Sequence, residues 1–272
     1  MAISKHVLTW RSILLTILSF LTINSNLVIF AQSDDTSLEK VHKSGALVVA
    51  IDPTYPPMEF EDKPGQTEGF DVDLATALAE SLNVKVKFVV MNWDGILAGL
   101  NSRRYDVIIS SMNITPERST QVDFVEYLKM AQVFVVGAGS TIKSKEGLSG
   151  KVVAVQADTT SFSWVSEQQT KGLAIKEIKA FKFATEAFSA LKVGQAEALV
   201  VDEPVGRFYA KQDKDSFKVS GEAVAAEPIG IAIRKDDQEL KRALADALKK
   251  LKSDGGFARI STKWFGSDLG NL

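Results

Sequence analysis

The polar residues of greatest chemical interest stand directly after apolar, β-branched runs of the sequence. They are hydroxyl, amide and carboxylate side chains at the predicted ends of separate strands. In open α/β sheets, ligands collect at the carboxyl ends of the strands, because the loops there offer unpaired backbone donors and helix N-termini. The pattern therefore predicts a polar pocket between two lobes rather than a standard catalytic centre. Its residues are Asp52, Ser110, Ser111, Asn113, Asp158, Thr159 and Asp202.

Arg118 is the candidate cation of this pocket. We expect it at the third position of a helix that has Thr115 as N-cap and Pro116 as first residue. A cation there opposes the helix dipole and costs about 0.3–1 kcal/mol unless an anion lies nearby. Since a guanidinium binds carboxylate bidentately, we expect Arg118 to bind a carboxylate. The alternative is a solvated Arg118, or one paired with Glu117 or Glu126.

Asp202 supplies the opposite charge after another apolar strand. A carboxylate at a strand end is suited to bind an ammonium group. On spacing alone, a simple helix N-cap before Glu203 and Pro204 explains Asp202 equally well.

Composition limits the function classes. The chain has 272 residues, with 32 Lys and Arg against 34 Asp and Glu, and a net charge of −2. The absence of Cys excludes disulfides, thiolate zinc sites and a cysteine nucleophile, and the two His leave almost no room for a multi-histidine metal site. We therefore expect no metal and no cofactor. The slightly acidic balance argues against a nucleic-acid partner or an anionic membrane.

The N-terminal region has the layout of a secretory signal peptide. Lys5 and Arg11 form a positive start, and the stretch from 12 to 33 is uncharged and rich in Leu and Ile. Cleavage after Ala31 or Ser33 is expected, so residues 1–31 are predicted to be the signal peptide and the mature protein to be periplasmic. An uncleaved membrane anchor is the alternative, because a bilayer core needs only about 20 residues.

Strand and helix patterns alternate along the rest of the chain. This alternation predicts an α/β fold with mostly parallel sheets flanked by helices, and two successive series predict two lobes. Apolar stretches at 130–136 and 225–233 are candidate hinge crossings, which makes the first lobe discontinuous, with residues 34–131 and 228–272, and the second lobe 132–227. The predicted strands are 46–51, 84–90, 106–110, 151–155, 174–178 and 198–201, and the predicted helices are 71–82, 96–100, one opened by Thr115, 162–169, 185–193, 237–252 and 256–264.

Several motifs identify a family resemblance. From about Leu38 to Gly266 the chain resembles the polar amino-acid-binding subunits of bacterial ABC importers, the periplasmic solute-binding proteins of the lysine/arginine/ornithine, histidine and glutamine group. Each motif alone is weak, but their order and spacing are specific. The motifs are Tyr55-Pro56-Pro57 with Glu59-Phe60, Gly69-Phe70-Asp71-Val72-Asp73-Leu74, Trp93-Asp94-Gly95-Ile96, Ile114-Thr115-Pro116-Glu117-Arg118 with Asp123-Phe124, Leu148-Ser149-Gly150-Lys151, Gly194-Gln195-Ala196-Glu197-Ala198, Gly230-Ile231-Ala232-Ile233-Arg234-Lys235 and Lys263-Trp264-Phe265-Gly266.

The resemblance implies a two-lobed clamp, with two hinge crossings, that closes on one free L-amino acid and presents itself to a membrane permease. It also implies that the protein is a monomer and that it is not an enzyme. Arg118 would hold the ligand α-carboxylate with help from Ser111 and Thr159, and Asp202 would hold the α-ammonium together with the Ser110 region. By the same resemblance, the side chain would lie between Tyr55 and Trp93, with Asp52 and Asn113 near its tip.

The physics of a zwitterion agrees with these roles. Both charged ends lose water on binding, so each needs a hydrogen-bonded partner. The pair of Arg118 and Asp202 would anchor any α-amino acid, so selectivity must come from the side-chain end. Two aromatic faces with Asp52 nearby favour a cation, and arginine, lysine or ornithine is the predicted ligand, with glutamine or histidine as alternatives.

One departure from the family pattern concerns Asp158. Where relatives carry Gly followed by Ser or Thr, this chain reads Gln156-Ala157-Asp158-Thr159-Thr160. A carboxylate directed at the ligand carboxylate would repel it. We expect Asp158 to face solvent or to cap the following helix.

Two rival functions are open at this stage. One is an enzyme of the cyclohexadienyl or arogenate dehydratase type, which shares the clamp fold and would need Glu59 or Glu167 as an acid with a raised pKa. The other is a sensory module that signals through a separate partner.

Overall fold

The computed structural model describes residues 35–269. The predicted signal peptide lies outside this range. Within the range, no helix combines the length and the apolar character that a membrane crossing requires.

Eight strands form one hydrogen-bonded sheet in the order β5-β1-β6-β11-β7-β10-β8-β9. The strand β1 is parallel to β5 and β6, and β8 is parallel to β9 and β10. The predicted two-lobed α/β fold is therefore confirmed, with a parallel part at each end of the sheet. The strands are β1 (Ala46–Ile51), β5 (Lys85–Val90), β6 (Val107–Ile108), β7 (Val122–Gly137), β8 (Val152–Gln156), β9 (Glu177–Phe181), β10 (Ala198–Asp202) and β11 (Phe217–Arg234).

The two long strands β7 and β11 join these parts. They pair antiparallel along most of their length, with Glu227 opposite Met130 and Ala226 opposite Ala131. Both predicted crossings therefore lie side by side on one ribbon, which is interrupted by register shifts between Ser220 and Ala225 and at Ile229. We propose to keep the predicted division, with 132–227 as lobe 2 and the other described residues as lobe 1.

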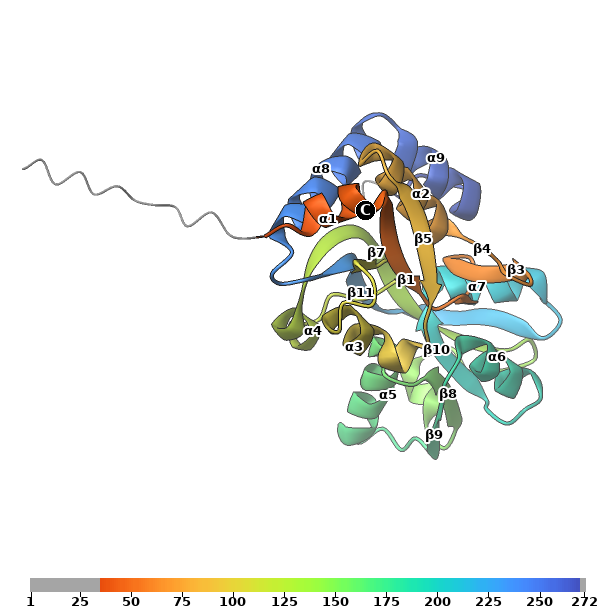
Figure 1. Cartoon of the computed structure of the whole chain (residues 1–272). Coiled ribbons are helices and arrows are strands. Elements are labelled where there is room, and N and C mark those ends of the chain that lie inside the picture. Colours follow the sequence, from red (N-terminus) through yellow and green to blue (C-terminus); the bar gives the residue numbers. More distant parts are fainter. Residues whose placement is uncertain (1–34, 270–272) are drawn as a thin grey trace, which may run out of the picture. The chain divides into compact units, whose positions relative to one another are not determined.

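Helices cover both parts of the sheet (Figure 1). In lobe 1, α8 and α9 pack against α2, so the C-terminal helices complete this lobe as expected. The predicted apolar stripe of α8 is confirmed, since Leu240, Leu244 and Leu248 are buried. The helices are α1 (Ser37–Ser44), α2 (Phe70–Ser81), α3 (Ile96–Asn101), α4 (Pro116–Gln121), α5 (Thr160–Thr170), α6 (Ala184–Lys192), α7 (Glu203–Gln212), α8 (Gln238–Ser253) and α9 (Gly256–Phe265).

Local sequence explains the elements that carry the site. The run Ala46–Ile51 is aliphatic throughout and lies between two parallel neighbours, where both faces of a strand are covered. In α4, the Thr115 side chain accepts a hydrogen bond from the Arg118 backbone N–H at 3.1 Å, and Pro116 is the first helical residue. The predicted start of α4 is therefore confirmed.

Some elements differ from the prediction. The strand β9 begins at Glu177 rather than at residue 174, and β6 covers only Val107–Ile108. The sequence patterns did not predict α1, α7 or a small antiparallel sheet. That sheet consists of β2 (Thr54–Tyr55), β3 (Glu59–Lys63) and β4 (Gln66–Glu68).

Candidate functional site

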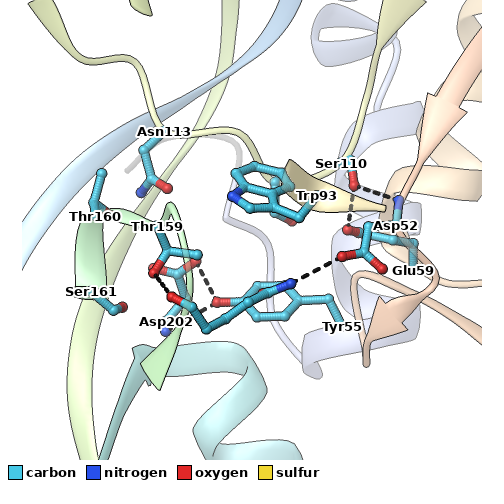
Figure 2. A pocket seen from close by; sticks show the side chains of 12 residues that line it. Asp52, Tyr55, Glu59, Trp93, Ser110, Asn113, Thr159, Thr160, Ser161 and Asp202 are labelled. Carbon is cyan, nitrogen blue, oxygen red and sulfur yellow. Dashed lines mark hydrogen bonds between the residues drawn. The ribbon is translucent and has the colours of Figure 1, made fainter. Parts of the chain in front are cut away.

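A pocket lies where strand ends of the two lobes meet. The space among its lining atoms, open solvent at its mouth included, is about 340 Å³. Figure 2 shows side chains that converge on it from several strand ends. The prediction that these strand ends come together is therefore correct. The lining residues are the predicted Asp52, Tyr55, Trp93, Ser110, Ser111, Asn113, Thr159 and Asp202, with Glu59, Gln156, Thr160 and Ser161 in addition.

The other two predicted site residues, Arg118 and Asp158, line an adjoining pocket of about 860 Å³, open solvent included. The two pockets share Trp93, Thr159 and Thr160, which form the wall between them. All ten predicted residues thus lie in one region between the lobes, but they do not line one cavity.

Arg118 is buried, with 9% of its surface exposed. Its Nη1 donates to the Asn113 carbonyl and its Nη2 to the Asp158 carbonyl, both at 3.0 Å. The guanidinium lies 5.3 Å from the centroid of the Trp93 ring. Burial lowers the pKa of Arg118, and the carboxylates of Glu227 and then Asp202 act against this shift. The alternative of a solvated Arg118 is therefore wrong.

Asp202 ends β10 and stands at the N-cap position of α7, as the alternative predicted, but its side chain makes no capping bond to the helix. Its Oδ2 accepts a hydrogen bond of 2.9 Å from the Tyr55 hydroxyl. Its Oδ1 is buried and has no hydrogen-bond partner among residues 35–269. Burial raises the pKa of Asp202 to about 7, although the Tyr55 bond and the Arg118 charge favour the ionised form. The buried carboxylate of Asp202 therefore has one oxygen, Oδ1, that is available to accept a hydrogen bond from a ligand.

Hydrogen bonds cross from lobe 1 to lobe 2 around the pocket. They join side chains of one lobe to side chains or carbonyls of the other, so the lobes are in direct contact here. The bonds are Tyr55 to Asp202 at 2.9 Å, Trp93 Nε1 to the Asp158 carbonyl at 2.9 Å, Arg118 Nη2 to the same carbonyl at 3.0 Å, and Gln156 Nε2 to Asp52 Oδ2 at 3.0 Å.

The serine donors are engaged within lobe 1. The Ser110 hydroxyl accepts from the Asp52 backbone N–H at 3.0 Å and donates to Glu59 Oε1 at 2.8 Å. The backbone N–H and the hydroxyl of Ser111 both donate to Asp71, at 2.7 and 3.0 Å. In this arrangement Ser111 has no free donor for a ligand carboxylate.

The loop that contains Asp158 supplies its backbone to the site. Asp158 is an exposed residue with φ of 58°, and its carbonyl accepts from Trp93 and Arg118. It is not the helix cap. Thr159 caps α5, because its hydroxyl oxygen accepts from the Phe162 N–H at 3.1 Å.

A buried carboxyl pair, of which Glu59 lines the pocket, was not part of the predicted site. Glu59 and Asp71 share a hydrogen bond, and Asp71 also accepts from Tyr127 and Ser111. Burial, followed by the Asp71 charge, raises the pKa of Glu59 well above its usual value, and burial raises the pKa of Asp71 to about 6. The protonated form is therefore favoured more strongly at Glu59 than at Asp71. Both residues stand in family motifs, which was the available signal.

Three further polar residues were missed. Gln156 bonds to Asp52, while Gln132 and Glu227 contact each other on the hinge strands. Gln132 and Glu227 follow no strand end, so the strand-end rule could not find them. Among the described residues, no group of three or more His, Cys, Asp or Glu is placed to hold a metal ion.

The fold and the pocket define a two-lobed solute-binding protein. The chain belongs to the bacterial extracellular solute-binding proteins, family 3, whose model matches residues 47–267. The resemblance to solute-binding proteins of polar amino-acid ABC importers is confirmed.

Individual relatives differ in what their names say they bind. The L-cystine-binding protein TcyJ of Escherichia coli K12 is 32% identical over 240 residues, 87% of this chain and 89% of the relative. An ancestral arginine-binding protein bound to arginine is 42% identical with a TM-score of 0.77, covering 82% of this chain and 99% of that one. Holo ArgBP from T. maritima is 37% identical with a TM-score of 0.72, covering 84% and 99%.

Proposed function

We propose that this protein is the extracytoplasmic receptor of an ABC importer and closes on one polar, cationic amino acid. Arginine is the first candidate, followed by lysine and ornithine. Arg118 binds the ligand α-carboxylate and Asp202 the α-ammonium, one from each lobe.

The unpartnered Oδ1 of Asp202 is the observation that carries this proposal. A buried acceptor without a donor is costly, so a site that keeps one needs a ligand donor. An ammonium group supplies that donor and also matches the negative charge. Arg118 lies close enough to affect the pKa of Asp202, which fits a ligand that carries both charges on one carbon.

The charge balance of the pocket supports a cationic side chain. Once Arg118 and Asp202 are matched by the two ends of a zwitterion, Asp52 and Glu59 are the remaining pocket carboxyls. Burial raises the pKa of both carboxyls, well above the usual value for Glu59, whereas hydrogen bonds from Thr54 and Gln156 favour the ionised form of Asp52. Asp52 is therefore the pocket carboxyl that a cationic side chain can match. A cationic side chain compensates it, whereas the neutral side chain of glutamine does not. Tyr55 and Trp93 line opposite sides of the pocket, as Figure 2 shows, and add cation–π attraction.

An enzymatic function of the dehydratase type has one observation in its favour. Glu59 lines the pocket, and burial raises its pKa well above the usual value, as acid catalysis requires. Its proton is shared with Asp71 inside lobe 1, however, and transfer to a ligand would break that bond. The binding function therefore has the better support.

The expected partner is the membrane permease of the importer, and the expected state is a monomer in the periplasm after removal of residues 1–31. The names of periplasmic and ABC transporter relatives support this location and this partner.

A thermal-shift screen tests the proposal. It uses the twenty amino acids with ornithine, citrulline and L-cystine, since a ligand at 100 times its dissociation constant stabilises by roughly 2.7 kcal/mol. Arginine, lysine or ornithine should raise Tm most, and Arg118→Ala should abolish the shift. The matched control Arg207→Ala changes an exposed arginine on α7 and should keep it. A shift with cystine alone would refute the cationic assignment, and turnover of arogenate would support the enzyme.

A further inference from the structure

A chain of hydrogen bonds runs from Arg118 through the hinge into lobe 2. Arg118 donates to the Asn113 carbonyl, and Asn113 Nδ2 donates to Glu227 Oε2 at 2.7 Å. Gln132 Nε2 donates to the same oxygen at 3.1 Å and to the Thr160 hydroxyl at 2.6 Å. We call the side chains of Asn113, Glu227, Gln132 and Thr160 the hinge chain.

The hinge chain occupies the crossing between the lobes. Glu227 is opposite Met130 on the β7–β11 ribbon, and Gln132 is opposite Asp202 on β10. Gln132 is completely buried. Asn113 is fixed to the same ribbon by a bridge with Ile229. The carboxylate of Glu227 on β11 therefore joins the amide of Asn113 in lobe 1 to the amide of Gln132 on the other hinge strand, β7.

We propose that Glu227 is a positioning residue that stabilises the closed arrangement of the lobes and holds Arg118 in place, without touching the ligand. This inference deepens the proposed function and rests on it. Glu227 does not line the pocket. Asn113 moves with lobe 1 and Thr160 with lobe 2, so a rotation of the lobes must stretch at least one bond of the hinge chain. The chain is complete only when the lobes are together.

The charge of Glu227 also reaches both ends of the proposed ligand site. It is the largest electrostatic influence that keeps Arg118 protonated, and it opposes ionisation of Asp202. By fixing the Asn113 carbonyl, it also positions one of the two acceptors that orient the guanidinium. Loss of Glu227 therefore disturbs the proposed carboxylate site indirectly, through the positions of Asn113 and Arg118.

The test measures lobe closure directly. The chain has no Cys, so exposed Lys249 of lobe 1 and Lys176 of lobe 2 can be replaced by cysteine and labelled with a donor and an acceptor dye. Energy transfer then reports the closed fraction, with and without arginine, in the parent and in Glu227→Ala, Glu227→Gln, Gln132→Ala and the double variant Glu227→Ala/Gln132→Ala. The control Glu222→Ala removes an exposed carboxylate from the same strand.

Glu227→Ala should lower the closed fraction in both conditions and weaken arginine binding about ten- to hundredfold, the range for a hydrogen bond to a charged group. Glu227→Gln keeps one acceptor and should recover part of the loss. Gln132→Ala and Glu227→Ala should be non-additive, because they break the same bond. Additive effects, or an unchanged closed fraction in a folded Glu227→Ala protein, would overturn the proposal.

These outcomes are separable from failure of the proposed function. If no amino acid binds the parent protein, the proposed function fails. The closed fraction measured without arginine then still decides the role of Glu227.

Discussion

The Tyr55 hydroxyl of lobe 1 donates a hydrogen bond of 2.9 Å to Asp202 at the end of β10 in lobe 2. The same carboxylate is the proposed ammonium site. In the proposed function, one side chain therefore takes part both in the contact between the lobes and in ligand binding, and several predictions depend on it.

Tyr55→Phe should weaken arginine binding about tenfold or more. The change removes a hydrogen bond to a charged group, worth roughly 1.5–3 kcal/mol, and leaves a second Asp202 oxygen without a donor. Titration calorimetry measures the loss. The matched control is Tyr209→Phe, which changes a packed ring of α7 outside the pocket and should leave affinity unaltered. Equal affinity for Tyr55→Phe and the parent would contradict a role of this bond in closure.

Asp52→Asn should weaken arginine and lysine much more than glutamine. Asp52 is buried and already accepts from Thr54 and Gln156, and the asparagine retains only part of this network. The loss common to all ligands is therefore read from glutamine, and the excess loss for arginine reports the charge. Competition binding with both ligands provides the comparison. Equal losses would remove the reason to prefer a cation.

Arginine affinity should fall as the pH falls below about 7. Burial raises the pKa of Asp202 to about 7, and an ammonium ligand needs the ionised form, so binding at pH 6 must release close to one proton. The expected decrease is about tenfold per pH unit. Calorimetry in buffers of different ionisation enthalpy counts the protons. Arginine binding to Glu59→Gln should release as many protons as binding to the parent. If the release disappears in this variant, the titrating group is Glu59 and not Asp202.

Folding stability should decrease as the pH rises from 5 to 7.5. The folded pKa of Asp202, about 7, and that of Asp71, about 6, are above the ordinary value of 3.8 for an aspartate. The folded protein therefore holds more protons than the unfolded chain in this window. The contribution of each group to the free energy of unfolding falls by roughly 1 kcal/mol per pH unit until the pH reaches its folded pKa. Urea unfolding of Asp202→Asn should give a smaller decrease. The control Asp213→Asn removes a carboxyl whose pKa is lowered, so above pH 5 its stability should change with pH as that of the parent does.

Gly69→Ala should destabilise the fold by several kcal/mol. Gly69 has φ of 140°, and a Cβ atom there would lie 2.1 Å from the Met58 carbonyl oxygen, on the segment that leads into Glu59. Gly65→Ala is the matched control, because Gly65 has φ of 77° but open space around it. The control should cost only about 1 kcal/mol from backbone strain. Similar unfolding midpoints for both variants would show that the close approach is tolerated.

Strong local patterns made most elements predictable. The aliphatic run of β1 and the cap of α4 were predicted correctly, because burial on both faces and a Thr-Pro start leave few alternatives. The strand β9 was misplaced because it pairs only with β8 at the edge of the sheet, so its sequence lacks a continuous apolar run. The helix α7 entered the prediction only through the alternative in which Asp202 is an N-cap, although Pro204 is well tolerated in a first helical turn.

The sequence predicted which strand ends contribute to the candidate site, but it did not predict the hydrogen-bond partners of the residues there. Asp52 and Asp202 were found because each directly follows a strand. The engagement of Ser111 by Asp71 and the contact of Gln132 with Glu227 depend on residues 40 and 95 positions apart. Such pairs arise from the packing of distant segments, and no local pattern of residue types specifies them.

The pairing of β7 with β11 restricts how the two lobes can move. A ladder of hydrogen bonds resists shear and stretching but permits bending and twisting where its register is broken, at Ser220–Ala225 and at Ile229. We expect the lobes to swing about a single preferred axis rather than to wander independently. Because Arg118 and Asp202 lie on opposite sides of this ribbon, we expect such a swing to bring the two side chains together along the same path at each closure.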